Sequence, residues 1–220
     1  MRIVKNLYGY VWQGSDNNCN SYVFKGVLNG EKHLVIDPGH LVTPFYRQSG
    51  LEILLEKMAE DGMDGDSIGC VVLTHGHPDH CEAAVSLREE NHALIALHEA
   101  DSGMFSDLGG KVDVFLDEGL LQLGSDIALQ VIHSPGHTPG HVTLYWASQK
   151  VLIAGDCIFY RSVGRADLPG GNYSLLEKTI DKLSKLDSEY LLCGHAYGNP
   201  GIISGREEVQ ENFRYIKNLF

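Results

Sequence analysis

The feature that most constrains this chain is the heptapeptide THGHPDH at positions 74–80, which follows an apolar run at 68–73. Four side chains able to bind a metal ion fall within six residues: His75, His77, Asp79 and His80. Neutral imidazole and carboxylate groups are natural ligands of a borderline divalent cation such as zinc, and a catalytic site also leaves a coordination position for water. Because α/β proteins present ligands beyond the carboxyl ends of strands, the motif predicts a metal site instead of an ordinary polar loop.

The spacing within the motif divides its donors into two groups. His75 and His77 flank Gly76, so in an extended backbone their side chains point the same way. Pro78 suits the first turn of a helix, which would carry Asp79 and His80. We therefore expect two groups of ligands that face two neighbouring positions.

Three later apolar runs, at 131–133, 151–155 and 190–194, are each followed by another possible ligand. His137 lies in a turn soon after the first run, whereas Asp156 and His195 directly follow the other two. Taken singly, His137 could be an exposed turn residue and Asp156 a helix cap. An aspartate that ends an apolar strand must, however, be paired or hydrated. The convergence of three strand ends favours one shared site.

The remaining pattern alternates strands and helices after a β-rich first third, which supports an α/β or α+β fold. Two hairpins are expected, the first with an Asn29-Gly30 turn. The predicted strands are 22–24, 33–36, 94–97, 142–146 and 151–154. The predicted helices are 51–58, 81–90, 173–185 and a C-terminal helix from Ser204 onward. A length of 220 residues fits one well-buried domain, residues 1–220.

The charge balance excludes a general nucleic-acid-binding surface. There are 17 basic against 29 acidic side chains, a net charge of -12, and the isoelectric point is near 5.3. The N-terminal stretch lacks a long apolar core before a small-residue cleavage site, and no apolar run is long enough to span a bilayer. We expect a cytoplasmic protein without membrane contact.

The five cysteines do not indicate a disulfide framework or a cysteine-type zinc site, because their number is odd and no CxxC pair occurs. Cys70 and Cys193 lie in apolar runs, where a free cysteine usually acts as a small buried hydrophobe. The same interpretation is preferred for Cys157, although its position beside Asp156 also admits a ligand or nucleophile.

The pattern HxHxDH, with the later His137, Asp156 and His195, resembles the metallo-β-lactamase superfamily. The resemblance implies a four-layer αββα sandwich with two divalent metal ions, zinc by preference and iron or manganese as options. It assigns His75, His77 and His137 to the first metal, Asp79, His80 and His195 to the second, and Asp156 to a bridge between them. A metal-bridging hydroxide would then attack an acyl bond, with Asp79 as a ligand that could also orient the nucleophile or shuttle its proton.

The strings SPGHTPGH and GRADLPGGN look like glyoxalase II and the related hydroxyacylglutathione hydrolases, which implies a small-molecule thioester substrate. The loop at 164–172 would wall the substrate site, with Arg165 and, less directly, Arg161 as contacts for a substrate carboxylate. His133 and His141 are expected to support the metal-binding histidines. Unlike full-length glyoxalase II, the chain is expected to lack a C-terminal helical extension that grips glutathione.

Other activities stay open from the sequence. A persulfide dioxygenase of the same superfamily would bind one iron through His75, His137 and Asp156, an arrangement that suits oxygen activation. A lactonase or β-lactamase is a third possibility, and a non-catalytic binding module a fourth. No chemistry is assigned to the histidines outside these motifs, namely His33, His40, His92 and His98.

Overall fold

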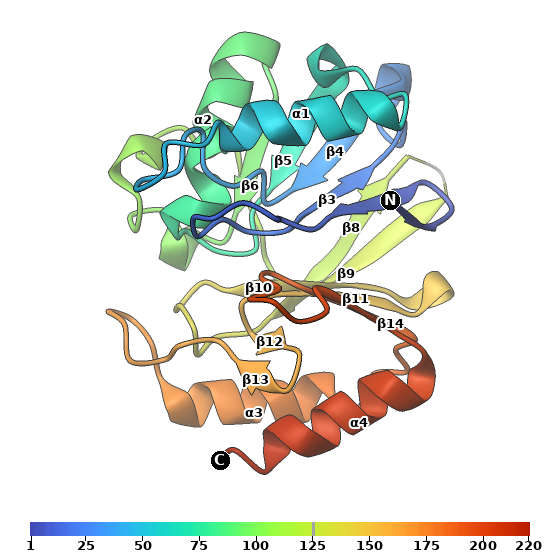
Figure 1. Cartoon of the computed structure of the whole chain (residues 1–220), viewed down its shortest axis with the longest axis vertical. Coiled ribbons are helices and arrows are strands. Elements are labelled where there is room, and N and C mark those ends of the chain that lie inside the picture. The colour runs from blue at the N-terminus through green and yellow to red at the C-terminus, as the bar shows by residue number, and fades with distance from the viewer. Residues whose placement is uncertain (125) are drawn as a thin grey trace.

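Two β-sheets pack face to face, and helices cover the outer face of each (Figure 1). The computed structural model describes residues 1–124 and 126–220. Helices α1 (Gly50–Glu60) and α2 (Pro78–Asn91) lie over the first sheet, and α3 (Tyr173–Leu183) and α4 (Arg206–Lys217) lie over the second. This confirms the four-layer αββα fold.

The first sheet holds seven strands in chain order. They are β1 (Arg2–Val4), β2 (Leu7–Tyr10), β3 (Ser21–Phe24), β4 (His33–Ile36), β5 (Ile68–Val72), β6 (Leu94–Leu97) and β7 (Val114–Phe115). Strands β1 to β4 pair antiparallel with their neighbours, and β4 to β7 pair parallel, so β4 takes part in both kinds of pairing. Because β4, β5 and β6 run parallel, their carboxyl ends share one edge of the sheet. The segments after these strands therefore meet there, including the 74–80 motif.

The second sheet has six strands in the order β15-β14-β11-β10-β9-β8. They are β8 (Gly119–Leu123), β9 (Ile127–His133), β10 (Val142–Trp146), β11 (Val151–Gly155), β14 (Tyr190–Cys193) and β15 (Ile202–Ser204). Strands β11 and β14 are parallel, so Asp156 and His195 leave the sheet at the same edge. A separate hairpin joins β12 (Ile158–Phe159) to β13 (Ser162–Val163).

Alternating side chains divide the core into three parts. In β4, Leu34 and Ile36 pack between the sheets, whereas Val35 packs under α1 and α2. In β11, Ile153 faces the space between the sheets and Leu152 faces α3 and α4. Both strands are buried on both faces, which explains why they read as continuous apolar runs.

The expected helices and hairpins are present, and the helices differ from expectation at their ends. Helix α2 begins at Pro78, earlier than 81, because proline is accommodated in the first turn. Helix α3 ends at Leu183, two residues before the expected end at 185. The C-terminal helix starts at Arg206 and not at Ser204, because Ile202–Ser204 pairs with β14 as an antiparallel strand. Within the described chain, no helix combines the length and apolarity needed to cross a membrane.

Candidate metal centre

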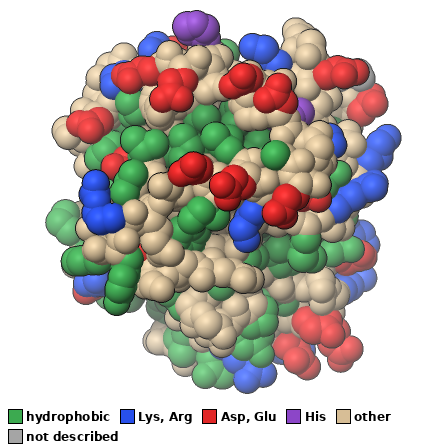
Figure 2. Space-filling model, turned by 45° about the horizontal axis from the view of Figure 1, so that its top comes forward, with side chains coloured by type: hydrophobic (Ala, Val, Ile, Leu, Met, Phe, Trp, Pro, Cys, Tyr) green, Lys and Arg blue, Asp and Glu red, His purple; other side chains and the backbone are tan. Residues whose placement is uncertain are grey.

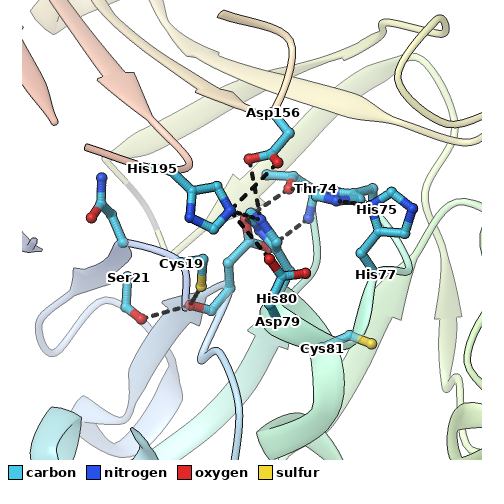
Figure 3. Close-up of polar contacts among 12 residues, drawn as sticks. Cys19, Ser21, Thr74, His75, His77, Asp79, His80, Cys81, Asp156 and His195 are labelled. Carbon is cyan, nitrogen blue, oxygen red and sulfur yellow. Dashed lines mark hydrogen bonds and ion pairs between the residues drawn. The ribbon is translucent and has the colours of Figure 1, made fainter. Parts of the chain in front are cut away.

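The 74–80 motif places its donors on a loop and on the start of a helix. His75 and His77 lie on the loop after β5, and Asp79 and His80 lie in the first turn of α2. His75 and His80 are fully buried. Figure 3 shows these side chains gathered beside His195, which comes from the end of β14 in the other sheet.

The first group of donors consists of three imidazole nitrogens that face one another. Nδ1 of His77 lies 3.0 Å from Nε2 of His75 and 2.9 Å from Nε2 of His137. All three donor atoms lie within 4.8 Å of one another. Tetrahedral nitrogen ligands at about 2.0–2.1 Å from zinc are roughly 3.3 Å apart, so the spacing is close to that of a zinc site.

The second group combines two imidazoles with a carboxylate. Nε2 of His195 lies 3.2 Å from Nε2 of His80 and 3.3 Å from Oδ2 of Asp79. The donor atoms of these residues also lie within 4.8 Å of one another. The structure thus brings together residues that are more than a hundred positions apart in the sequence.

Asp156 lies between the two groups. Its Oδ1 is 3.1 Å from Nε2 of His80, and its Oδ2 is 3.5 Å from Nε2 of His195 and 3.6 Å from Nε2 of His137. Figure 3 shows the carboxylate pointing from the second sheet toward His80 and His195. Asp156 is therefore not a simple helix cap, because its carboxylate faces donors from both groups.

The outer nitrogens of two rings are fixed by one buried aspartate. Oδ2 of Asp37 lies 2.9 Å from Nδ1 of His80 and accepts a hydrogen bond from the Thr74 hydroxyl at 2.7 Å. The Thr74 oxygen in turn lies 3.1 Å from Nδ1 of His75. These contacts place the ring protons on Nδ1 and leave the Nε2 lone pairs directed into the centre.

Backbone carbonyls fix two further rings in the same way. Nδ1 of His137 donates to the carbonyl of Arg165 at 2.6 Å, and Nδ1 of His195 donates to the carbonyl of Asn18 at 3.0 Å. A carbonyl oxygen can only accept, so both rings keep Nε2 unprotonated when neutral. The tautomers suit cation binding.

The electrostatics of the centre favour a bound positive charge. Burial by itself would raise the pKa of Asp156, but His195 and His80 hold it well below its usual value. Burial would lower the pKa of His195, yet Asp156 raises it to about 9. Burial and neighbouring His137 lower the pKa of His77 to about 4, so this ring is neutral at physiological pH.

The donor set fits two divalent cations. It offers five imidazoles and two carboxylates, chemistry that suits zinc, iron or manganese. Oδ1 of Asp156 is buried and receives no hydrogen bond from the residues that the structure describes, although it lies close to His80. It is unfavourable to bury a carboxylate oxygen without a donor, and it is unfavourable to face imidazole lone pairs toward one another. A bound cation would satisfy both.

A pocket of about 530 Å³ opens onto this centre. Four of the donors line it, namely His77, Asp79, His137 and Asp156, and Phe159, Val163 and Leu168 add apolar surface. Tyr197 also lines the pocket, with its ring stacked on His195 at a centroid distance of 4.8 Å. A substrate in this pocket would meet the donors and an apolar wall together.

The two predicted substrate arginines occupy different environments. Arg165 lines the pocket, and its guanidinium forms a two-pronged contact with Asp167 at 2.9 and 3.0 Å. The Arg161 guanidinium lies over the rings of Tyr160 and Tyr215, and Arg161 is not among the residues that line the pocket. The geometry is compatible with a substrate contact for Arg165 and does not support one for Arg161.

The two predicted supporting histidines also differ. His141 is fully buried, and its Nε2 accepts the backbone N–H of Asp156 at 3.1 Å. His133 instead contacts the carbonyl of Pro139 at 2.9 Å and stacks on His98. The described contacts of the His133 ring are with His98 and Pro139 and do not reach the donors.

Several residues of the centre were missed in the sequence. Asp37 directly follows the predicted strand at 33–36, so the strand-end rule used for Asp156 could have found it. Asn17 donates from Nδ2 to Oδ2 of Asp79 at 2.6 Å, and Asn18 and Asp101 also hold ligand segments. Asparagine in an irregular loop carries no comparable signal.

Cys157 takes no part in the pocket. Its side chain is fully buried, and its sulfur contacts the carbonyl of Ser134 at 3.3 Å and Nδ1 of His141 at 3.4 Å. Burial raises the pKa of this thiol, which disfavours the reactive thiolate. All five cysteines of the described chain are free.

Comparison with known proteins places this centre in a family context. Residues 14–195 match the family described as the metallo-beta-lactamase superfamily. An uncharacterized protein of Aquifex aeolicus is 38% identical over 155 residues, 64% of this chain and 73% of that protein. Hydroxyacylglutathione hydrolase GloC of Haemophilus influenzae is 31% identical over 178 residues, 73% of this chain and 78% of the relative.

A solved structure shares the fold of this chain. A crystal structure described as a di-iron-bound form is 29% identical in sequence, with a TM-score of 0.67. The match covers 85% of this chain and 91% of that one. The fold is therefore shared over most of both molecules.

Proposed function

This chain belongs to the metallo-beta-lactamase superfamily, and from this premise we propose that it is a metal-dependent hydrolase that cleaves a thioester of the hydroxyacylglutathione type. The observation that carries the proposal is the position of Asp156 between two groups of converging donors, in the lining of a pocket. We assign His75, His77 and His137 to a first cation, Asp79, His80 and His195 to a second, and Asp156 to both.

The bound cations would supply a hydroxide nucleophile at neutral pH and polarise the substrate carbonyl. The protein residues orient the reaction around that chemistry. Asp79 lines the pocket, and Asn17 holds its Oδ2 in place through Nδ2 at 2.6 Å. Burial would raise the pKa of Asp79, but His195 lowers it well below its usual value, so the side chain stays a carboxylate. It can accept a hydrogen bond from the attacking water and so orient it.

The acyl side of the substrate is assigned to the apolar wall. Phe159, Val163 and Leu168 line the same pocket as the donors and would exclude water from the scissile bond. Arg165 also lines the pocket and would contact a carboxylate of the thiol carrier. The similarity to hydroxyacylglutathione hydrolase GloC supports this class of substrate.

A small-molecule substrate also agrees with the surface charge. The net charge is -12, and on the face shown in Figure 2 the Lys and Arg side chains are interspersed with Asp and Glu. Nucleic-acid-binding proteins usually gather basic side chains in a continuous patch. We therefore propose a small thioester and no nucleic-acid partner.

The direct test is metal quantification on protein purified without added metal, together with turnover of S-lactoylglutathione and of a simple alkyl thioester. We expect close to two metal ions per chain, with thioester cleavage that is lost after chelation and restored by zinc, iron or manganese. The Asp156→Ala variant should lose both metal content and activity. Full activity in protein stripped of transition metals would overturn the proposal.

The same experiment separates the alternative reaction class. A mononuclear-iron persulfide dioxygenase would contain one iron per chain and consume oxygen in the presence of a persulfide. The proximity of Asp79, His80 and His195 favours a second cation and hence the hydrolase. One tightly bound iron with persulfide-dependent oxygen uptake would reverse that preference.

A further inference from the structure

Asp101 is a fully buried carboxylate that lies just after β6, at the end of a short 3-10 helix (Glu99–Asp101). Its oxygens accept three hydrogen bonds from neutral donors. Oδ1 accepts the N–H of Gly140 at 2.6 Å, and Oδ2 accepts the N–H of Gly76 at 3.1 Å and the Thr138 hydroxyl at 2.5 Å. A buried carboxylate with neutral partners costs desolvation, so its presence here needs an explanation.

The three donors belong to two segments that carry the first group of imidazoles. Gly76 separates His75 from His77, and Thr138 directly follows His137. One carboxylate therefore joins two loops that are about sixty residues apart in the sequence. The Gly76 loop is tied to Oδ2 alone, and the 138–140 loop is tied to both oxygens, so the two loops that carry His77 and His137 share Oδ2.

The fit is too close for larger residues at either glycine. A Cβ atom at Gly76 would lie 2.7 Å from the carbonyl oxygen of Asp101, and one at Gly140 would lie 2.7 Å from its Oδ1. Both distances are shorter than real Cβ contacts allow. The glycines of HGH and TPG thus permit the approach of Asp101.

We propose that Asp101 is a positioning residue that sets the separation of the His77 and His137 loops and thereby controls the first cation position selectively. Its contacts differ from those of Asp37, which reaches His80 directly and His75 through Thr74. The inference rests on the proposed function only in requiring that cations bind at this centre.

The Asp101→Asn variant is the sharpest probe, because it keeps the shape and removes one acceptor. The new amide would direct N–H groups at a backbone N–H that can only donate. We would titrate metal-depleted protein with Co²⁺ and follow the visible absorption, with His77→Ala and His195→Ala marking the first and second positions. Changes in outer contacts usually alter metal affinity about 10- to 100-fold.

His77→Ala should abolish binding of the Co²⁺ ion at the first position. We expect Asp101→Asn to weaken the binding of that same ion at least about 10-fold and to leave the affinity of the second position unchanged. Asp113→Asn is the matched control. Asp113 accepts the N–H of Ile95 in β6 and pairs with Arg88, so its loss disturbs the same region without touching the donors. The control should bind both equivalents as the wild type does.

Thr138→Val provides a second variant should Asp101→Asn fail to fold, because it removes only the hydroxyl contact. The role of Asp101 would be overturned if the wild type binds two equivalents of Co²⁺ while the variants bind as the wild type does or lose affinity equally at both positions. Either result would leave the hydrolase proposal standing. A wild type that binds no Co²⁺ would overturn both.

Discussion

Oδ2 of Asp37 lies 2.9 Å from Nδ1 of His80 and accepts the Thr74 hydroxyl at 2.7 Å, so one buried oxygen orients two histidines of the centre. Asp37 sits just beyond β4, with its backbone in the left-handed region at φ 52°. Its Oδ1 accepts the backbone N–H of Thr74 at 2.8 Å. The start of the 74–80 motif is therefore fixed by the neighbouring strand as well as by its own sequence.

The Asp37→Asn variant should weaken metal binding at both positions. In either orientation, the asparagine NH2 group would face a hydrogen-bond donor, namely the Thr74 N–H or the groups that donate to Oδ2. The substitution also removes the negative charge that makes His80 a better ligand. We expect the affinity for Zn²⁺ to fall about 10- to 100-fold, measured by competition with a chromophoric chelator. Asp113→Asn again serves as control, and unchanged binding in Asp37→Asn would contradict the role assigned to this contact.

Arg165→Ala tests the substrate wall without disturbing the centre. His137 is held by the backbone carbonyl of Arg165, which the substitution retains. Loss of a contact from this exposed arginine should raise KM for S-lactoylglutathione up to roughly fivefold and leave kcat unchanged. Steady-state kinetics would measure both constants.

Arg161→Ala is the matched control for that comparison. Its guanidinium lies over Tyr160 and Tyr215, so its loss should cost about 0.5–1 kcal/mol of stability. KM should stay at the wild-type value. An equal rise of KM in both variants would mean that neither arginine acts through a specific contact.

The sequence points to the proposed donors because six of the seven lie within the 74–80 motif or directly after an apolar run, and His137 lies in a turn soon after another such run. Asp156 and His195 follow strands whose ends are recognisable from local pattern alone. The parallel pairing of β11 and β14 then brings both residues to one edge, a consequence of topology that the runs do not reveal.

The supporting residues are harder to predict because their orientation is set by tertiary contacts. His133 and His141 flank His137 at similar distances in the sequence, yet one stacks on His98 and the other lies behind Asp156. Asp101 is separated from β6 by His98, Glu99 and Ala100 and carries no motif. Its partners become neighbours only when β5, β6 and the second sheet have assembled.

The imidazole of His33 predicts a pH dependence of stability that is separate from the metal centre. Its Nδ1 accepts the N–H of Gly26 at 3.0 Å, which requires the neutral ring. Burial, assisted by Lys25 and opposed by Asp64, lowers its pKa below the ordinary value of 6.5. The unfolded chain therefore binds this proton more readily, and the stability contributed by the contact is present above pH 6.5 and lost as the pH falls.

The test is His33→Asn, which retains an acceptor close to the position of Nδ1 and cannot be protonated. We would measure urea unfolding of metal-depleted protein in chelator between pH 5 and 8 and subtract the variant from the wild type. The wild type should lose stability relative to His33→Asn as the pH falls below about 6.5. The exposed His92→Asn serves as control, and a pH-independent difference for His33→Asn would count against the assignment.

The space between the sheets should dominate the stability of the fold. Leu34 is fully buried in β4, where it pairs with Phe24 and Cys70 of the neighbouring strands and packs between the two sheets. Leu34→Ala removes apolar area and leaves a cavity, which typically costs about 2–5 kcal/mol.

Leu120→Ala removes the same atoms from the edge strand β8, where the side chain is 76% exposed, and should change stability by about 0.5 kcal/mol or less. Both values would come from urea unfolding monitored by circular dichroism at one pH, with an unchanged denaturant slope showing that the unfolded states are comparable. Because both substitutions remove the same side-chain atoms, the difference between them isolates burial between the sheets. Equal losses would show that the core between the sheets does not carry the stability assigned to it.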